Sequence, residues 1–485
     1  MNLTEKYKPI IGLEIHAQLN TKTKAYSPDE NIYGASPNTK TSVISLGHPG
    51  TLPKVNEKVI EYAVKLGLAV GSKITEKNEY ARKNYFYADL PKGYQITQDK
   101  TPICTGGHIS LINESGQTKK INITRIHMEE DAGKSIHDID PFNTLIDLNR
   151  AGVPLVEIVS EPEINSADEA YQYVNEVRKL LRYLEICDGN MEEGSLRCDA
   201  NISVMKKNSK QFGTKVEVKN MNSTRNLKKA IDFEINRQVN LLENGNKVVH
   251  ETRSFNAANN STVSMRHKEE ANDYRYFPEP DIQPFYVSKN YIESIKQKLP
   301  PLPNELKSKF ITDFKLSDYD ANILVSDKKI ALYFNEVCKL TNNYKLASNL
   351  VNGSIRSYLN ENAKDIDEIK VKPYNLSELI KMIEEGKVSN SNASSKIIPL
   401  MISSKESPKD IAIKYNLIIE DNKDEIKKFI DDTLKKYPKK VEEYKNGKKG
   451  LIGLFMGEVM KLSKGKADPK KTNQLLVKEL EKKFE

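Results

Sequence analysis

Residues Ile11 to Asn20 read IGLEIHAQLN. Apolar and polar residues alternate along this stretch, and a period of two predicts a β-strand with one apolar and one polar face. The polar face carries Glu14 and His16, whose Cα atoms would lie about 7 Å apart on a strand. Both side chains could then reach one divalent cation or one phosphoryl group, whereas an isolated pair of this kind can also belong to a solvated sheet face.

The same alternation returns twice. It governs Leu196–Val204, whose polar face would include Arg197 and Asp199, and it governs Lys215–Lys219. The outer faces of these strands are charged, unlike the Thr- and Ser-rich face of an ordinary wet sheet. We therefore expect an antiparallel sheet with a polar working surface over an apolar underside.

Length and charge limit the classes of protein. The chain has 485 residues, enough for several domains, and a net charge of +8 that permits nucleic-acid binding without requiring it. It contains neither an apolar run that could span a bilayer nor the apolar core of a signal peptide at its start, so we expect a cytoplasmic protein with no membrane partner. The cysteines are scattered and form no C-x-x-C pair, which predicts small buried residues at Cys104, Cys187, Cys198 and Cys338.

The chain changes character near residue 295. Short alternating runs give way to helical periodicity after the proline-rich stretch Leu299–Pro303. This predicts an α+β protein with a sheet domain over residues 1–295, a helical domain over 296–406 and a small helical tail over 407–485. Helices are expected at Asn56–Leu68, Asp168–Leu184, Asp327–Leu340, Asn375–Glu385, Asp424–Lys435, Gly450–Leu462 and Asn473–Phe484.

Two further segments carry carboxylates. Glu157 lies inside the apolar run Val153–Val159, and a buried carboxylate needs a partner. That partner could be a structural salt bridge, or Glu157 could complete a metal site with Glu14 and His16. The segment His127–Lys134, HMEEDAGK, offers an acidic loop before a glycine turn, which suits a hard cation but is more often a solvated turn.

Cations and aromatic rings interleave in Arg82–Tyr87 and Asp273–Asp281. Such segments can stack on a base while holding phosphates, as an adenine nucleotide or an RNA end would require, although the first could also be a core strand. The sequence has no P-loop, no strand-linked G-x-G-x-x-G and no G-x-S-x-G, so any ATP would bind without these motifs.

The motifs taken together resemble one family, the B subunits of the glutamyl-tRNA(Gln)/aspartyl-tRNA(Asn) amidotransferases. The resemblance runs in order along nearly the whole chain and rests on Gly12–His16, Arg82–Tyr87, His127–Lys134, Leu148–Arg150, Met191–Asn201 and Asp273–Asp281. It implies a cradle-shaped antiparallel domain, a helical domain and a YqeY-like tail that contacts tRNA. It also implies a heterotrimer whose other members are an amidase and a small third protein, in which the B subunit uses ATP and Mg²⁺ to phosphorylate mischarged Glu-tRNA(Gln) or Asp-tRNA(Asn) before amidation.

The resemblance also implies roles for particular residues. The positions where the family holds a divalent cation are Glu14, His16, Glu130 and Glu157. Catalytic roles are expected for Glu14, His16, Glu130, Lys83 and Arg197. The placement of charge, rather than the resemblance, leads us to expect phosphate or transition-state contacts from Arg82, Lys83, Arg197 and Lys215, and packing against the nucleotide or the acceptor end from Tyr85 and Arg275. Contacts to tRNA are expected in the tail from Lys448, Lys449, Lys464 and Lys466.

The chain departs from many family members in residues 20–50. Those members carry C-x-C and C-x-x-C, a four-thiolate zinc site, where this sequence has Ser27, Asp29, Ser42 and Ser45. Zinc is therefore not expected. Two other classes also fit the charged motifs: a metal-dependent hydrolase acting on RNA, and a noncatalytic scaffold that binds tRNA.

Overall fold

The computed structural model describes residues 6–112, 116–267, 273–419, 423–463, 467 and 469–482. The chain forms two compact units, Met1–Leu302 and Pro303–Glu485. Across these described residues, no helix combines the length and apolar character that crossing a membrane requires. The division into three parts at residues 295 and 406 stays a prediction.

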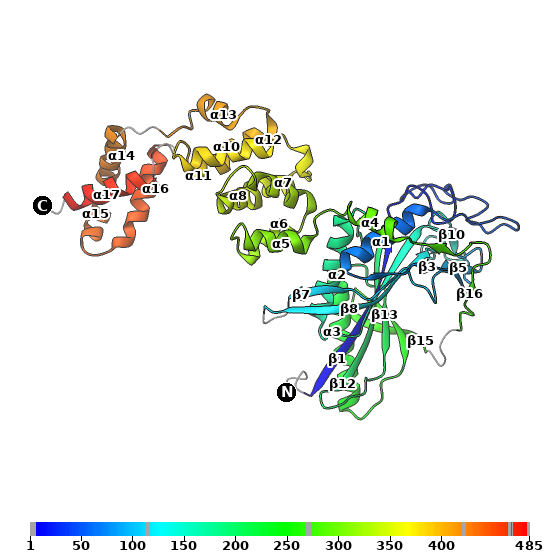
Figure 1. The fold of residues 1–485 in the computed structure, drawn as a ribbon. Helices are drawn as coiled ribbons and strands as arrows, with labels where there is room; N and C mark the ends of the chain where they lie inside the picture. Colours follow the sequence, from blue (N-terminus) through cyan, green and yellow to red (C-terminus); the bar gives the residue numbers. More distant parts are fainter. Residues whose placement is uncertain are drawn as a thin grey trace. The chain divides into compact units, whose positions relative to one another are not determined.

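The first unit is built on a ten-stranded sheet with β1 near its middle (Figure 1). The strand order is β15-β14-β13-β12-β1-β11-β8-β6-β2, and β7 also pairs with β8. Their bounds are β1 Tyr7–Gln18, β2 Lys73–Ile74, β6 Cys104–Thr105, β7 His108–Ile112, β8 Thr118–Glu130, β11 Pro154–Ser160, β12 Leu196–Lys206, β13 Val216–Lys219, β14 Glu251–Asn256 and β15 Ser261–His267. The shorter strands are β3 Lys77–Asn78, β4 Ala81–Asn84, β5 Tyr94–Thr97, β9 Lys134–Ile136, β10 Leu145–Asp147, β16 Phe277–Pro278 and β17 Phe285–Tyr286.

The expected strands at β1, β12 and β13 are confirmed, and β1 pairs antiparallel with both β11 and β12. One pair departs from the antiparallel expectation, because β13 and β14 run parallel. Helix α3, Thr224–Glu243, connects these two strands. Parallel neighbours need a crossover of this kind, which short alternating runs in a sequence do not reveal.

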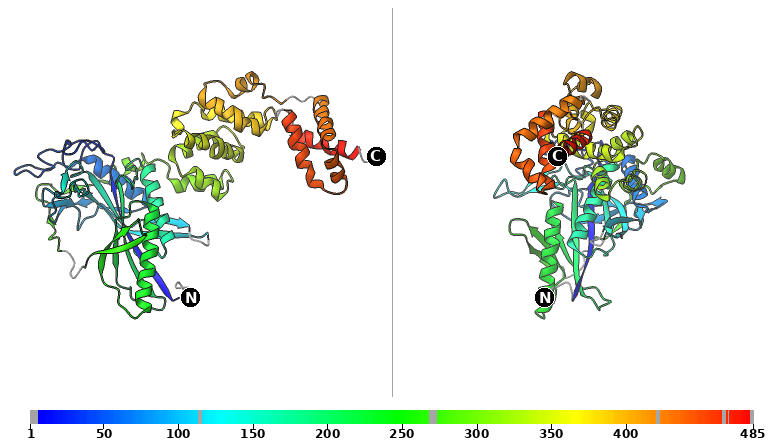
Figure 2. Two further views of the ribbon diagram at one scale, coloured as in Figure 1. Left: turned by 180° about the vertical axis from the view of Figure 1, so that it is seen from behind. Right: turned by 90° about the vertical axis from the view of Figure 1, so that its left-hand side faces the viewer.

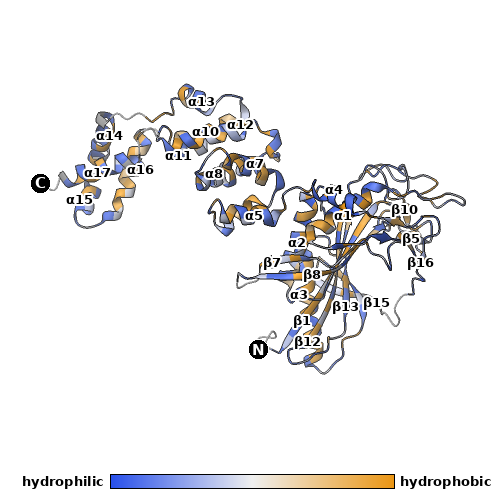
Figure 3. Cartoon of the chain, in the orientation of Figure 1, coloured by the Kyte–Doolittle hydropathy of each residue, from blue (hydrophilic) through white to orange (hydrophobic). Residues whose placement is uncertain are grey.

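Helices cover the apolar face of the sheet. Helices α1 (Glu57–Val70), α2 (Ala167–Tyr183) and α3 contact the strands, as the view from behind shows for the green α3 (Figure 2). Leu13 and Ile15 of β1 are fully buried in the same hydrophobic cluster as residues of all three helices. Each fully buried Leu or Ile contributes about 1.5–3 kcal/mol, so this apolar layer fixes which face of β1 remains polar (Figure 3).

The short helix α4, Lys289–Lys296, belongs to the first unit because it packs against α1. Ile295 is part of the sheet domain's core, and Leu299 and Leu302 pack against it. The first unit therefore continues to Leu302.

The second unit is helical. It comprises α5 Pro303–Thr312, α6 Asp318–Leu324, α7 Lys328–Cys338, α8 Tyr344–Leu350, α9 Arg356–Glu361, α10 Pro373–Glu384, α11 Asn390–Asn392, α12 Ile398–Ser403, α13 Pro408–Lys414, α14 Lys423–Lys436, α15 Pro438–Lys445, α16 Ile452–Leu462 and α17 Pro469–Lys482. Helices α14 to α17 enclose a hydrophobic cluster of their own that includes Ile430 and Phe455. The helices expected from periodicity are confirmed over the described residues, with ends that differ by a few residues, and the expected end at Phe484 lies outside the described residues.

Candidate active site

Four charged or polar side chains form a row across the middle of the sheet. His127 of β8 lies opposite Glu157 of β11, which lies opposite His16 of β1, which lies opposite Arg197 of β12. Directly opposed residues of antiparallel strands point to the same side of a sheet. Because side chains alternate along β8, Glu129, two residues after His127, lies on the same face and joins this row.

The carboxylates and imidazoles of the row are in contact. Glu157 Oε2 lies 3.2 Å from His16 Nε2 and 3.2 Å from His127 Nε2. Glu129 Oε1 lies 3.1 Å from His127 Nε2, and its Oε2 lies 4.0 Å from His16 Nε2. Of His16, His127, Glu129 and Glu157, the most accessible is His16, with 20% of its side chain exposed against 3% for Glu129. We call His16, Glu129 and Glu157 the carboxylate cluster.

Electrostatics keep this cluster ionised. Burial disfavours charge on all its members. The hydrogen bond from His127 nevertheless lowers the pKa of Glu129 to about 2. Hydrogen bonds from His127 and His16 lower the pKa of Glu157 well below its usual range. Burial opposes the imidazolium of His127 as well, yet hydrogen bonds to Glu129 and Glu157 raise its pKa to about 9. The carboxylates of the cluster are therefore negatively charged, and protonated imidazoles balance part of that charge.

A divalent cation fits this donor set. Ligand atoms of His16, Glu129 and Glu157 all lie within 4.8 Å of one another. Two carboxylates and an imidazole are donors that Mg²⁺ or Mn²⁺ accepts. His127 would then support both carboxylates from the buried side, as outer partners of metal ligands do.

Lys83 of β4 adds a positive charge close to the cluster. Burial opposes its charged form, but the carboxylates of Glu129 and Glu157, with Tyr276, raise the pKa of Lys83. Its Nζ lies 5.1 Å from the centre of the Tyr274 ring and 6.0 Å from that of Tyr85. The ammonium group is thus held near the carboxylates and among aromatic rings.

Two of the four expected metal positions lie apart from the cluster. Glu14 is two residues from His16 on the same face, where its carboxylate accepts a hydrogen bond of 2.7 Å from Asn201 Nδ2. Glu130 leaves β8 on the opposite side, where it pairs with Lys92 and accepts a 2.9 Å hydrogen bond from the Ile96 amide. Glu129 occupies the place in the cluster that the sequence analysis gave to Glu130.

Glu129 rather than Glu130 lies in the cluster because the prediction of an acidic loop at this segment is wrong. Strand β8 continues to Glu130, and Glu129 and Glu130 pair with Leu155 and Pro154 of β11. Successive side chains of a strand face opposite ways, so the neighbouring carboxylates cannot act at one site.

The two segments rich in cations and aromatic rings come together. The amide of Asn84 donates a 2.9 Å hydrogen bond to the carbonyl of Tyr274, and Arg82 pairs with Phe277 in the β4–β16 ladder. Between the segments lies a cavity of about 380 Å³ that Lys83, Tyr85, Tyr274 and Arg275 help to line. The core-strand alternative is wrong, because Phe86 is 79% exposed.

Arg82 and Lys215 lie outside this cavity lining. Arg82 donates to Glu279 through Nε at 2.7 Å and Nη2 at 2.8 Å, and it also reaches Asp281 at 2.9 Å. Its guanidinium stacks on the ring of Tyr94 at 4.0 Å. Lys215 is exposed and directly precedes β13.

Asp131 and Lys219 were not among the site residues expected from the sequence. Asp131 accepts a 2.9 Å hydrogen bond from Gln18 and a 3.0 Å hydrogen bond from Arg197, so it ties the loop after β8 to β1 and β12. Lys219 Nζ lies 2.5 Å from Asp199 and 3.0 Å from Glu217. Alternation along β13 already indicated the face that Lys219 shares with Glu217, and Asp131 belongs to the acidic segment His127–Lys134, but no local signal indicated its contacts with Gln18 and Arg197.

The expected tRNA-contacting lysines fall partly within the described tail. Lys448 and Lys449 are exposed: Lys448 pairs with Glu443 at 3.1 Å, and Lys449 Nζ lies 4.4 Å from the centre of the Tyr444 ring. Lys464 and Lys466 lie outside the described residues.

Comparisons with known proteins cover both units. Residues 9–293 match the family described as GatB/GatE catalytic domain, and residues 332–480 match the family described as GatB domain. A catalytic sheet domain followed by a helical GatB domain defines a subunit of the amidotransferase class.

Curated relatives identify the family of amidotransferase subunits to which the chain is similar. The chain is 47% identical over 474 residues to the B subunit of an aspartyl/glutamyl-tRNA(Asn/Gln) amidotransferase from Clostridium novyi, covering 98% of this chain and 99% of the relative. It is 46% identical over 473 residues to that of Thermodesulfovibrio yellowstonii, with the same coverage, and 47% identical over 477 residues to that of Geobacter sulfurreducens, again with the same coverage. The chain therefore belongs to the family of aspartyl/glutamyl-tRNA amidotransferase B subunits.

Proposed function

We propose that this chain activates and amidates the side-chain carboxylate of mischarged Glu-tRNA(Gln), Asp-tRNA(Asn) or both. The observation that carries the proposal is the carboxylate cluster on an open sheet face, with Lys83 and an aromatic cavity beside it. The printed names of the relatives support the tRNA substrates.

The reaction has two balanced steps. The γ-phosphoryl group of ATP passes to a side-chain carboxylate oxygen of the aminoacyl-tRNA, and ADP leaves. Ammonia then attacks the acyl carbon, inorganic phosphate leaves and an amide remains. A free carboxylate is a poor acyl donor, so the phosphorylation creates the leaving group that amidation needs.

His16, Glu129 and Glu157 would hold Mg²⁺, and Glu14 lies on the same face two residues from His16. The bound ion supplies positive charge against the phosphates of ATP. Lys83 would stabilise negative charge that develops on the transferred group, because its ammonium is charged and already oriented before the substrate binds. Arg197, which Asp131 holds through a hydrogen bond, is placed for a similar contact.

A purine base could bind in the cavity by stacking on its aromatic side chains. Tyr85 and Tyr274 are packed edge to face with ring centres 6.2 Å apart, and Arg275 lies at the same cavity. Aromatic faces and guanidinium planes stack on bases irrespective of sequence. We assign Tyr85 and Arg275 to the nucleotide or to the acceptor end of tRNA, while the partners of Arg82 favour a structural role for that residue.

The proposal includes partners. An amidase in the same complex would release ammonia from glutamine, and a small third protein would complete the heterotrimer. The tail would contact tRNA through Lys448, Lys449, Lys464 and Lys466.

The test is ATP-dependent conversion of Glu-tRNA(Gln) to Gln-tRNA(Gln) by the reconstituted complex, with ammonium supplied so that the amidase does not limit the reaction. We expect product from the wild type and a loss of about a hundredfold or more in Glu157→Gln, because one cluster carboxylate is removed. Glu176→Gln, on helix α2 at the other face of the sheet, is the matched control and should stay active.

Other results would favour other classes. A complex that binds tRNA but neither hydrolyses ATP nor forms product would be a scaffold. RNA cleavage without ATP would indicate a hydrolase.

A further inference from the structure

A long loop, residues 19–56, separates β1 from α1. Within residues 19–56 the backbone forms an isolated bridge between Thr23 and Glu30, and further backbone hydrogen bonds and side-chain hydrogen bonds supply the remaining connections. A loop of this length without helix or extended strand needs fastening if it is to keep one conformation.

Asp29 is the centre of that fastening. Its Oδ2 accepts hydrogen bonds from the Ser42 amide at 3.0 Å, the Ser42 hydroxyl at 3.1 Å and the Ser45 hydroxyl. The Ser27 hydroxyl lies 3.0 Å from Asp29 Oδ2 and 3.0 Å from Ser45 Oγ. One carboxylate oxygen therefore joins two chain segments, Ser27–Asp29 and Ser42–Ser45, and we call Ser27, Asp29, Ser42 and Ser45 the Asp29 cluster.

Lys24 supplies the balancing charge. Its side chain is fully buried, and its Nζ donates a 2.7 Å hydrogen bond to the carbonyl of Lys40 and lies 3.9 Å from Asp29 Oδ2. Burial opposes the ionised form of Asp29, but the hydrogen bonds from Ser45, Ser27 and Ser42 lower its pKa. The aspartate is thus a charged acceptor surrounded by donors.

These four residues occupy the positions at which many family members carry zinc-binding cysteines. Here the donor set is one carboxylate and three neutral hydroxyls, which is a poor set for zinc because zinc prefers thiolate and imidazole ligands. The hydroxyls already donate to the carboxylate, so the cluster satisfies itself through hydrogen bonds.

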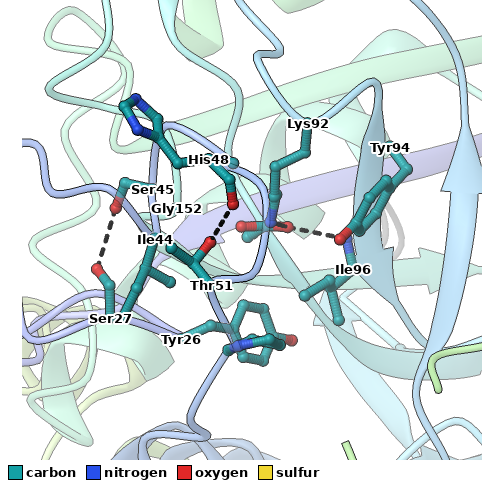
Figure 4. A pocket seen from close by; sticks show the side chains of 13 residues that line it. Tyr26, Ser27, Ile44, Ser45, His48, Thr51, Lys92, Tyr94, Ile96 and Gly152 are labelled. Carbon is teal, nitrogen blue, oxygen red and sulfur yellow. Dashed lines mark hydrogen bonds and ion pairs between the residues drawn. The ribbon is translucent and has the colours of Figure 1, made fainter. Parts of the chain in front are cut away.

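The Asp29 cluster is connected to the active-site strands. Ser27 and Ser45 face each other at a pocket that His48 and Lys92 also line (Figure 4). Gly47 packs so closely that an added Cβ would lie 2.7 Å from Cγ of Lys92. Lys92 in turn pairs with Glu130, the last residue of β8.

A second connection runs through the backbone. The Ala25 amide donates to the carbonyl of Gly152 at 2.9 Å, and the Gly152 amide donates to the carbonyl of Asp131 at 2.9 Å. Asp131 contacts Gln18 and Arg197 of the polar face. Both connections end at the C-terminal end of β8, where Glu129 belongs to the carboxylate cluster.

We propose that Asp29 is a positioning residue that fastens residues 19–56 without a metal, and that this loop in turn holds Lys92, Glu130 and Asp131 so that the end of β8 keeps its place in the active site. The effect on catalysis rests on the proposed function, whereas the fastening itself does not.

The test compares Asp29→Asn with the wild type in the full complex, using hydrogen exchange measured by mass spectrometry. The amide has one acceptor oxygen and no charge, so we expect exchange in residues 19–56 to become about tenfold faster or more, while exchange in α2 and α3 stays unchanged. Wild-type exchange should be the same with a zinc chelator and with added zinc. Asp140→Asn is the matched control, because Asp140 accepts hydrogen bonds from the amides of Phe142 and Asn143 in an exposed turn.

Ammonium-dependent amidation tests the positioning role. We expect kcat of Asp29→Asn to fall about tenfold or more and KM for the aminoacyl-tRNA to change by less than about twofold, because the loop shifts catalytic groups without removing a substrate contact. Ser45→Ala removes one hydrogen-bond donor to Asp29 and should lower kcat by a smaller factor. This variant replaces Asp29→Asn in the test if Asp29→Asn does not fold.

Unchanged loop exchange in both variants, or loop protection that a chelator abolishes in the wild type, would overturn the fastening. Faster loop exchange with unchanged kcat would overturn the positioning role. A wild type that makes no product would count against the proposed function and leave the exchange result to decide the fastening.

Discussion

Glu129 and Glu130 are consecutive in the chain, yet their side chains leave β8 on opposite faces of the sheet. Glu129 contacts His127 at 3.1 Å and belongs to the carboxylate cluster, whereas Glu130 pairs with Lys92 beneath the loop that Asp29 fastens. The period of two along a strand makes these two carboxylates functionally separate.

The first prediction follows from that separation. Glu129→Gln should weaken Mn²⁺ binding by about tenfold or more, because it removes one of three ligands, and Glu130→Gln should change it by less than about twofold. Electron paramagnetic resonance of free Mn²⁺ in a titration measures both. Equal weakening in the two variants would contradict the assignment of Glu129 to the cluster.

A second prediction concerns Arg82. Its bidentate pair with Glu279, whose side chain has no exposed area, should make Arg82→Ala costly by about 2–4 kcal/mol, because a carboxylate would remain buried without its partner. A double-mutant cycle with Glu279→Ala, measured by thermal unfolding, should show that the second substitution costs much less than the first. Additive losses would mean that the pair is not coupled.

The third prediction is a pH dependence of the metal-free protein. Because the pKa of His127 is raised from 6.5 to about 9 in the folded state, its contribution to stability is fully present below pH 6.5 and is lost as pH rises through 9. Comparing wild type with His127→Gln in a chelator should show a stability difference that shrinks by on the order of 2–3 kcal/mol between pH 6 and about pH 9.5. Thermal unfolding at both pH values provides the measurement, and a difference independent of pH would argue against the ion pair.

The Asp29 cluster gives a fourth prediction. Since Ser27, Ser42 and Ser45 all converge on Asp29, replacing all four residues by cysteine should create a site that takes up about one zinc ion per chain. Metal analysis and loop hydrogen exchange, with and without zinc, are the measurements. The triple variant that keeps Asp29 should bind zinc more weakly, and a folded four-cysteine variant that takes up no zinc would contradict the convergence.

A fifth prediction concerns the tail. Neutralising Lys448, Lys449, Lys464 and Lys466 to Gln should weaken tRNA binding and lower the slope of log affinity against log salt by up to about 0.9 for each phosphate that the tail no longer neutralises. Lys329→Gln with Lys339→Gln is the matched control, since both lysines are paired with carboxylates in the helical unit. An affinity and a salt slope equal to those of the wild type would exclude binding of tRNA by these lysines.

Local patterns predicted much of the fold. Alternation along Ile11–Asn20 identified β1 and the side on which Glu14 and His16 lie, and helical periodicity identified helices α7, α10, α14, α16 and α17 of the second unit. These features depend on residues close in sequence, and local propensity and burial agree there.

The sequence could not predict which strands pair, in which register, or which distant residues meet as a result. His16 meets Glu157 and Arg197 only because of the order and register of four strands, and Arg82 meets a glutamate 197 residues away. The segment that holds Glu129 and Glu130 was expected to be an acidic loop, whereas it is the end of strand β8, where neighbouring side chains face opposite ways and only Glu129 joins the cluster. The parallel β13–β14 pair is likewise a consequence of chain crossover, which alternation does not encode.

Strand β1 is synthesised first, yet both of its neighbours come much later: β11 spans Pro154–Ser160 and β12 spans Leu196–Lys206. One edge of β1 therefore stays unpaired until β12 has left the ribosome, and both edges, with apolar side chains such as Ile11, Leu13 and Ile15, stay unpaired until β11 has left it. During that interval both strand edges are open to aggregation, which makes this segment a natural client of chaperones. Arg197 of β12 is the last member of the row to be synthesised, so a translation product that stops before β12 lacks Arg197 and leaves one edge of β1 unpaired.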